Sequence, residues 1–427
     1  MERLRLLILA EQNNPDWMSG PLLGYLQSYA LAQKHDVTVV THRRNLDALI
    51  RAKPPFREIV AIDAGRVDLF YSWMLKRVLR GDHGSQLLTA MRIPYYIFYE
   101  RLVWARLSSR LRNGEFDAVL RLTPVSPVLP SYLARPLKKL GVPFIVGPVN
   151  GGLPRPAQVG QPWKERAAYR LRSVFRWVPF VERTYADASA VIAGSSWTYK
   201  ELRFCGPRLF FLPENGISTT LLKPKAPVAP EGPLRIVFIG RLIDLKRCDL
   251  AIIGSAGLMR QGRAHLTIVG QGPEMARLRA IAGEMGVTEH VKFTGVLSHA
   301  QTMEILAASD VFVFPSIRDF GGGVVFEALA CGVPPIVVDY GGPADIVTPA
   351  VGVKLPLAAA DVIARGIAET LTKFDRDRTM LMRMSAEAQT YAADCLTWEV
   401  KSDFLTSLIY WAMGRRSAPA SAIPGWR

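Results

Sequence analysis

Two carboxylates bracket a glycine turn in the stretch PSIRDFGGGVVFEALA. Asp319 stands before Gly321–Gly323, and Glu327 follows eight positions after Asp319. Apolar residues predict a buried strand over Val311–Phe314 and a helix over Val324–Ala330. A helix that begins at a glycine turn presents unpaired N–H groups and the positive end of its dipole to a ligand. The turn therefore suits a phosphate or the polar edge of a sugar, although many α/β proteins carry such a turn without a ligand.

Two cations lie on a second loop, in the string GRLIDLK. Arg241 and Lys246 are five residues apart and follow an apolar run, Ile236–Ile239, that predicts a buried strand. An arginine offers a planar fork and a lysine a point charge, so the two can converge on one diphosphate. An isolated Arg/Lys pair would be explained equally well by surface charge.

The whole string from residue 315 resembles the carboxylate-x7-carboxylate motif of the retaining glycosyltransferases of family 4, also called glycosyl transferases group 1. Asp319 stands where the family usually has Glu, and Gly321 where it usually has Phe. The string GRLxxxK matches the diphosphate-binding loop of that family. The residues of the first motif that fall in register are Pro315, Ser316, Glu327, Ala328, Gly332, Pro334, Ile336, Gly341 and Gly342.

This resemblance implies a retaining, metal-independent hexosyltransferase that needs no cofactor beyond its nucleotide-sugar substrate. Arg241 and Lys246 are expected to stabilise the departing diphosphate. Asp319 is expected to hold a sugar hydroxyl and Glu327 the ribose hydroxyls, neither acting as a nucleophile. Arg241, Lys246 and Asp319 are the expected catalytic residues. The expected donor-binding residues are Gly20, Gly240, Arg241, Lys246, Leu297, Asp319, Gly322, Gly323, Val324 and Glu327, with no metal ligands.

Several other functions remain open. The Glu-to-Asp change at residue 319 also fits a nucleotide-sugar-binding protein with impaired catalysis, and another GT-B enzyme such as an epimerase or phosphorylase is a third reading. The loop EQNNPDWMSGPLLG lacks a Gly-x-Gly-x-x-Gly string, which disfavours a nicotinamide dehydrogenase. No recognised nucleic-acid-binding module accompanies the arginines, so nucleic acid is not an expected partner.

The elements around these motifs predict an α/β protein. Strands over Leu4–Ala10 and Val37–Thr41 with a helical pattern between them form a βαβ unit. In the second half, buried strands alternate with helices, which is typical of a parallel, doubly wound sheet. Ligands of such sheets bind at the carboxyl ends of the strands, where Arg241, Gly270, Gly295 and the Asp319 turn fall. The resemblance implies the GT-B fold, with two Rossmann-like domains facing a central cleft.

The predicted domain boundaries follow from a proline-rich stretch, KPKAPVAPEGP, at residues 223–233. We expect an acceptor-binding domain over residues 1–222, this linker, and a nucleotide-sugar-binding domain over 234–390. A C-terminal helix over 391–414 is expected to cross back to the first domain, followed by a flexible tail over 415–427.

Charge is unevenly distributed along the 427 residues. The chain carries a net +16, but residues 1–215 hold 31 Lys and Arg against 17 Asp and Glu, and residues 216–427 hold 22 against 20. The basic first half is expected to meet something anionic, such as a lipid-linked diphosphate or a membrane surface. From Val67 to Asn113 the sequence is rich in aromatic and basic residues, with Phe70, Trp73, Met74 and Leu75 near Lys76 and Arg77. Such a helix fits a membrane interface or an ordinary core.

The four cysteines are far apart and form no Cys-x-x-Cys pair, which favours buried thiols in a reducing compartment. No apolar run approaches the roughly 18 residues that span a bilayer. We therefore expect a cytoplasmic protein, peripheral on the inner face of the membrane. It would transfer a sugar to a lipid-linked or polysaccharide acceptor in cell-envelope or exopolysaccharide synthesis.

Overall fold

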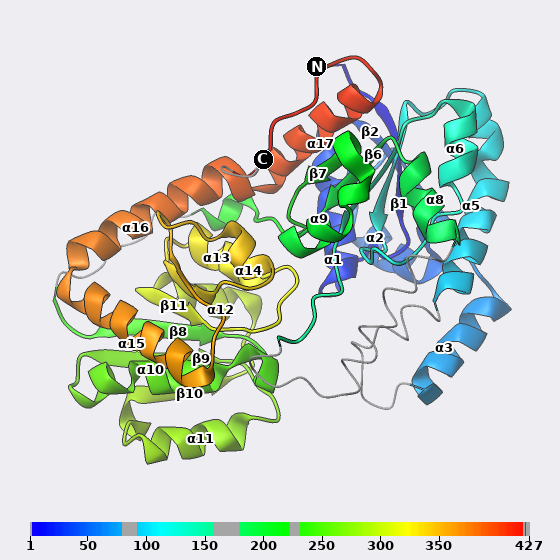
Figure 1. The fold of residues 1–427 in the computed structure, drawn as a ribbon. Helices are drawn as coiled ribbons and strands as arrows, with labels where there is room; N and C mark the ends of the chain where they lie inside the picture. Colours follow the sequence, from blue (N-terminus) through cyan, green and yellow to red (C-terminus); the bar gives the residue numbers. More distant parts are fainter. Residues whose placement is uncertain (1, 79–91, 157–178, 223–230, 422, 424–427) are drawn as a thin grey trace. The chain divides into compact units, whose positions relative to one another are not determined.

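The computed structural model describes residues 2–78, 92–156, 179–222, 231–421 and 423 (Figure 1). Most of the predicted linker, part of the aromatic stretch and the end of the predicted tail lie outside the described residues. The chain forms two compact units. Unit 1 contains residues 1–152, 162–214 and 398–427, and unit 2 contains residues 153–161 and 215–397.

Unit 1 is built on a seven-stranded parallel sheet with the order β3-β2-β1-β4-β5-β6-β7. Ile8 of β1 is paired with Val39 on one side and Leu120 on the other. The strand order reverses between β1 and β4, which makes this point the topological switch point of the sheet. The strands are β1 (Arg5–Ala10), β2 (Asp36–His42), β3 (Glu58–Ile62), β4 (Ala118–Thr123), β5 (Phe144–Val149), β6 (Ala190–Ala193) and β7 (Leu209–Phe211).

Both faces of this sheet are covered, because alternate residues of β1 enter different cores. Leu6 and Ile8 belong to the core that includes Leu405 and Leu408 of the last helix, whereas Leu7 belongs to the core on the other face. The helices are α1 (Gly20–Ala32), α2 (Leu46–Ala52), α3 (Arg66–Val78), α5 (Ile93–Arg112), α6 (Ala134–Leu140), α8 (Pro179–Asp187), α9 (Ser196–Glu201) and α17 (Trp398–Ala412). α17 packs against α1.

Unit 2 holds a six-stranded parallel sheet with the order β10-β9-β8-β11-β12-β13, which reverses between β8 and β11. Its strands are β8 (Leu234–Ile239), β9 (Ala264–Val269), β10 (Val291–Gly295), β11 (Val311–Phe314), β12 (Pro335–Val338) and β13 (Val353–Leu355). Its helices are α10 (Cys248–Arg260), α11 (Met275–Glu284), α12 (His299–Ala307), α13 (Gly323–Ala330), α14 (Gly342–Ile346), α15 (Ala360–Arg376) and α16 (Arg378–Tyr391). The two doubly wound sheets confirm the predicted α/β class.

The end of the chain differs from the helix predicted over residues 391–414. α16 ends at Tyr391, a π-helical turn follows over Ala392–Leu396, and α17 begins only at Trp398. Thr397 between them is extended, with φ −71° and ψ 155°, and forms an isolated parallel bridge with Ile217. That bridge and the hydrogen bond from Ile217 N to Leu396 O tie residues 215–222 to unit 2 rather than to the predicted first domain.

Candidate active site

Glycines bring the loops at the carboxyl edge of the unit 2 sheet close together. The amide of Gly270, after β9, donates to the carbonyl of Gly295, which ends β10, at 2.9 Å. A Cβ atom at Gly270, whose φ is 139°, would lie 1.9 Å from the carbonyl oxygen of Gly240, after β8. Only glycine fits such an approach. These loops therefore form one backbone-lined edge, where the sequence placed the ligand.

The loop after β8 carries the two predicted cations. Arg241 is exposed, and within the described residues its guanidinium has no hydrogen-bond or ion-pair partner. Lys246 ends a short 3₁₀ turn, Asp244–Lys246, and is partly buried with its ammonium 5.0 Å from the centroid of the Phe314 ring. An exposed guanidinium and a largely buried ammonium on one loop are groups that can bind a diphosphate.

Lys246 forms an ion pair with Asp319, across the switch point between β8 and β11. The other carboxylate oxygen of Asp319 accepts a hydrogen bond from the amide of Gly322 at 3.0 Å. Both oxygens of Asp319 are thus engaged inside the protein, and one of the two glycine amides predicted for the ligand is used. The structure therefore brings Lys246 and Asp319 into direct contact, so that Asp319 holds Lys246.

The glycine turn ends where α13 begins. Gly322 adopts the left-handed conformation, with φ 59° and ψ 34°, and Gly323 is the first residue of α13. In the described part of the chain the Gly323 amide has no hydrogen-bond partner, and the Asn215 amide oxygen would lie 3.4 Å from a Cβ at this residue. Val324, next in the helix, is partly buried. The start of α13 thus keeps a donor for an anion.

Glu327, one turn into α13, contacts a residue that the sequence did not single out. Its Oε1 lies 2.9 Å from Nε2 of His299, the first residue of α12. This hydrogen bond raises the pKa of His299 above its usual value, while partial burial opposes the shift. Leu297, two residues earlier, is half-buried beside the exposed Val296. A signal for His299 was present, because Ser298 and Gln301 form a capping box that fixes where α12 starts.

A short segment of the chain that follows β5 also belongs to unit 2. The carbonyl of Pro154 accepts a hydrogen bond from the Tyr340 hydroxyl at 2.7 Å, and Arg155 pairs with Asp244 at 2.5 Å. Asp244 lies on the same loop as Arg241 and Lys246. Arg155 therefore pairs with the acidic residue of the predicted diphosphate loop, a contact that sequence spacing alone did not suggest.

Gly20 was the one donor-binding residue predicted in unit 1, and it begins α1. A Cβ at this position would lie 2.9 Å from Oε1 of Gln12, and one at Gly24 would lie 2.2 Å from the Gln12 carbonyl oxygen. Close packing of the loop after β1 against α1 therefore requires glycine at residue 24, whereas at residue 20 the end of the Gln12 side chain could move aside. Gly20 belongs to unit 1, whereas the other predicted site residues belong to unit 2.

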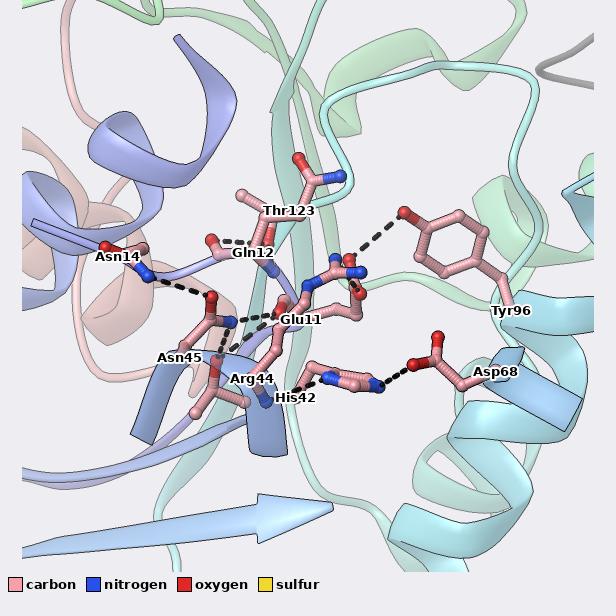
Figure 2. A network of polar contacts seen from close by, with 10 residues as sticks. Glu11, Gln12, Asn14, His42, Arg44, Asn45, Asp68, Tyr96 and Thr123 are labelled. Atoms are coloured by element: carbon pink, nitrogen blue, oxygen red, sulfur yellow. Dashed lines mark hydrogen bonds and ion pairs between the residues drawn. The ribbon is translucent and has the colours of Figure 1, made fainter. Parts of the chain in front are cut away.

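The switch point of unit 1 holds a buried polar network that the sequence did not predict (Figure 2). Glu11, directly after β1, accepts hydrogen bonds from Arg44 Nη2 at 2.5 Å and from the Tyr96 hydroxyl at 3.2 Å. His42 Nδ1 accepts from the Arg44 amide at 3.0 Å, and its Nε2 lies 3.4 Å from the Asp68 carboxylate. Burial lowers the pKa of His42, and the nearby positive charge of Arg44 is the second largest cause. Because Nδ1 accepts a hydrogen bond, the ring carries a proton on Nε2, which faces Asp68.

Part of unit 2 is similar in sequence to a known protein family. Residues 221–390 match the family model described as glycosyl transferases group 1. A GDP-mannose-dependent alpha-(1-6)-phosphatidylinositol monomannoside mannosyltransferase of Mycobacterium tuberculosis is 32% identical over 224 residues, covering 47% of this chain and 57% of that protein. A related monoacylated-substrate mannosyltransferase of Corynebacterium glutamicum is 33% identical over 154 residues, 34% of this chain and 39% of that protein. The chain thus matches about half the length of these relatives or less.

Solved structures extend the likeness to both sheets. HepE of Anabaena, solved with UDP and glucose, has a TM-score of 0.58 and 15% identity, covering 95% of this chain and 98% of that one. At this identity the likeness concerns the fold, and the fold is GT-B. The match to the glycosyl transferases group 1 model covers residues 221–390, which lie in unit 2.

Proposed function

We propose that the chain is a retaining glycosyltransferase that moves a sugar from a nucleotide-sugar donor to a lipid-linked or polysaccharide acceptor in envelope or exopolysaccharide synthesis. The observation that carries the proposal is the pairing of a cationic loop with a helix start across the switch point of unit 2. Arg241 and Lys246 follow β8, and the Asp319 turn leads from β11 into α13. Ligands of open α/β sheets bind at such a point.

The charge arrangement suits departure of a nucleoside diphosphate. Preorganised cations and amide donors stabilise charge that develops on a leaving group. Arg241, Lys246 and the Gly323 amide supply these groups without a metal ion. Asp319 holds Lys246 in place and is neutralised by it. Donor binding is therefore expected to make Lys246 share its charge between Asp319 and the diphosphate.

Glu327 and His299 complete the donor site in this proposal. A carboxylate accepts hydrogen bonds from two adjacent ribose hydroxyls, and the hydrogen bond with His299 orients the Glu327 carboxylate. Leu297 and Val296 lie on the same loop as His299 and would face the base.

The acceptor and the location of the protein are inferred from its relatives and its charge. The mycobacterial relative is named for a phosphatidylinositol monomannoside substrate, which is a lipid-linked acceptor. A protein from Rhizobium meliloti that is 30% identical over 177 residues is named a lipopolysaccharide core biosynthesis glycosyltransferase. We place the protein in the cytoplasm, peripheral on the inner face of the membrane. In the described part of the chain, no helix is long and apolar enough to cross a bilayer.

The second candidate, a nucleotide-sugar-binding protein with impaired catalysis, is favoured by one observation. Both oxygens of Asp319 are occupied inside the protein, which leaves the sugar hydroxyl without its predicted acceptor.

Two assays separate the candidates. Thermal stabilisation by a panel that includes GDP-mannose and UDP-glucose detects donor binding, because a ligand of the native state raises the melting temperature. Release of the nucleoside diphosphate in the presence of a lipid extract detects transfer. Binding without release would support the second candidate. Transfer that is unchanged by EDTA would support metal independence, and loss of transfer that Mg²⁺ or Mn²⁺ restores would contradict it.

A further inference from the structure

One helix of unit 1 presents large apolar side chains outward. In α3, Leu69 is 70% exposed, Phe70 57% and Trp73 56%. With the exposed Arg66 and Arg77 they follow the spacing i, i+3, i+4, i+7, i+11, which is one face of a helix. We call these five residues the α3 stripe. Side chains of this size are rarely left exposed together unless they meet a partner.

The opposite face of α3 fixes the direction in which the stripe points. Val67 and Tyr71 pack against the cluster that contains Tyr95 and Leu129. Asp68 on the same side pairs with the buried His42 (Figure 2). α3 also packs on α5, next to which it lies in Figure 1. Rotation of α3 to bury the stripe would break these contacts, so the stripe is held at the surface.

The charges around the stripe select one kind of partner. Asp68 is the only acidic residue of α3, and it is turned inward to His42, whereas Arg66 and Arg77 face outward. The Arg77 guanidinium lies 5.4 Å from the centroid of the Trp73 ring. Residues 1–215 as a whole carry 31 basic against 17 acidic side chains. Tryptophan with flanking arginines on an amphipathic helix is the composition that binds at the headgroup level of anionic bilayers.

We propose that the α3 stripe docks unit 1 on an anionic lipid surface. Leu69, Phe70 and Trp73 enter the boundary between headgroups and acyl chains, and Arg66 and Arg77 contact lipid phosphates. Docking would bring a lipid-linked acceptor to the enzyme, and in this respect the inference rests on the proposed function. The sequence of Val67–Asn113 fitted either a membrane-interface helix or a core helix. α3 has one face of each kind, because Val67 and Tyr71 pack inward while Leu69, Phe70 and Trp73 are exposed.

Co-sedimentation with vesicles tests the docking without any activity. The full chain is mixed with vesicles of phosphatidylcholine alone or of phosphatidylcholine with phosphatidylglycerol. We expect binding to the anionic vesicles only. The double variant Phe70→Ser/Trp73→Ser should bind them at least about tenfold more weakly, because it lacks two aromatic groups that would be buried in the bilayer. Arg66→Gln with Arg77→Gln is expected to weaken it about five- to thirtyfold and to remove most of its salt dependence. The matched control is Ile50→Ser with Phe204→Ser, since these unit 1 side chains are 58% and 52% exposed but lie off the stripe.

The outcomes separate docking from catalysis and from self-association. Each variant must keep the melting temperature shift that the wild type shows with a nucleotide sugar, which reports on unit 2. Equal vesicle binding by wild type and Phe70→Ser/Trp73→Ser, or equal losses in the variant and the control, would overturn the proposal. So would a wild-type dimer in sedimentation velocity that the stripe variant converts to monomer, because the stripe would then cover a second copy. A failure of nucleotide-sugar stabilisation with intact vesicle binding would instead refute the donor site.

Discussion

The two switch points of this chain use the same sheet topology in opposite ways. In unit 1, the reversal between β1 and β4 is filled by side chains, with Glu11 2% exposed and His42 3% exposed in a closed set of hydrogen bonds. In unit 2, the reversal between β8 and β11 is lined by glycines and carries the exposed Arg241. A site lined by backbone and a free cation can accept an anion without first breaking internal contacts. The same sheet topology therefore offers a ligand site in both units, but the loop residues determine whether the protein's own side chains occupy it.

Lys246→Ala is expected to produce the largest effect. Loss of the ammonium that faces the leaving group should lower kcat about 10²–10³-fold, since one preorganised donor contributes that much in a site shielded from water. The variant should still fold, with a lower melting temperature without ligand because Asp319 loses its cation. Release of the nucleoside diphosphate measures the rate. Lys292→Ala on β10, an exposed lysine of the same unit, is the matched control. A Lys246→Ala enzyme as fast as this control would remove Lys246 from the site.

Glu11→Ala tests whether the unit 1 network is structural. It leaves Arg44 and Tyr96 without their acceptor, so the free energy of unfolding should fall by about 2–4 kcal/mol, the lower end being favoured because Arg44 is 36% exposed. Urea denaturation measures the change. Asp16→Ala, which breaks the exposed pair with Arg51, should stay within about 1 kcal/mol. Similar losses in both variants would mean that the buried network contributes no more than a surface pair.

Asp319 distinguishes a positioning role from a merely structural one. Asp319→Ala should lower kcat at least about tenfold, because Lys246 loses the carboxylate that holds it, whereas Asp319→Glu should keep most of the rate. KM for the donor should change less than kcat. Asp339→Ala, at an exposed carboxylate, serves as the control. Equal rates for the Ala, Glu and wild-type proteins would exclude Asp319 from catalysis.

His299 gives the smallest expected effect, which depends on pH. Its pKa is raised in the folded chain, so the pair with Glu327 stabilises the fold fully below the unfolded pKa of about 6.5 and loses this contribution as the pH rises through the folded pKa. The His299 side chain is 64% exposed, so solvent screening keeps the effect small. The melting temperature of the wild type minus that of His299→Gln should therefore be larger at mildly acidic than at alkaline pH. A difference independent of pH would contradict the pairing.

The sequence predicted the backbone of the unit 2 site more fully than its side-chain partners. The strand over Val311–Phe314 has the predicted bounds, and the helix after it begins one residue earlier than predicted, at Gly323. Both follow from apolar runs and glycines that are local in sequence. The partner of Asp319 is 73 residues away and becomes its neighbour only because β8 lies beside β11. Hydrophobic pattern does not determine that strand order.

Other contacts were missed for the same reason. His299 meets Glu327 because α12 packs beside α13, and Glu11 meets Tyr96 across 85 residues. The last helix was predicted as one element because Leu405, Leu408 and Ile409 continue an apolar stripe. The extended Thr397 that interrupts this helix pairs with Ile217, and no local sequence pattern indicates that pairing.

The most direct test of the central claim is the melting temperature of the full chain with a panel of nucleotide sugars, compared with that of the Arg241→Ala/Lys246→Ala variant. We predict that at least one nucleotide sugar raises the melting temperature of the wild type and that the double variant, although still folded without ligand, loses this rise. A rise of the same size in the double variant, or no rise with any member of the panel, would contradict a nucleotide-sugar site at the carboxyl edge of the unit 2 sheet.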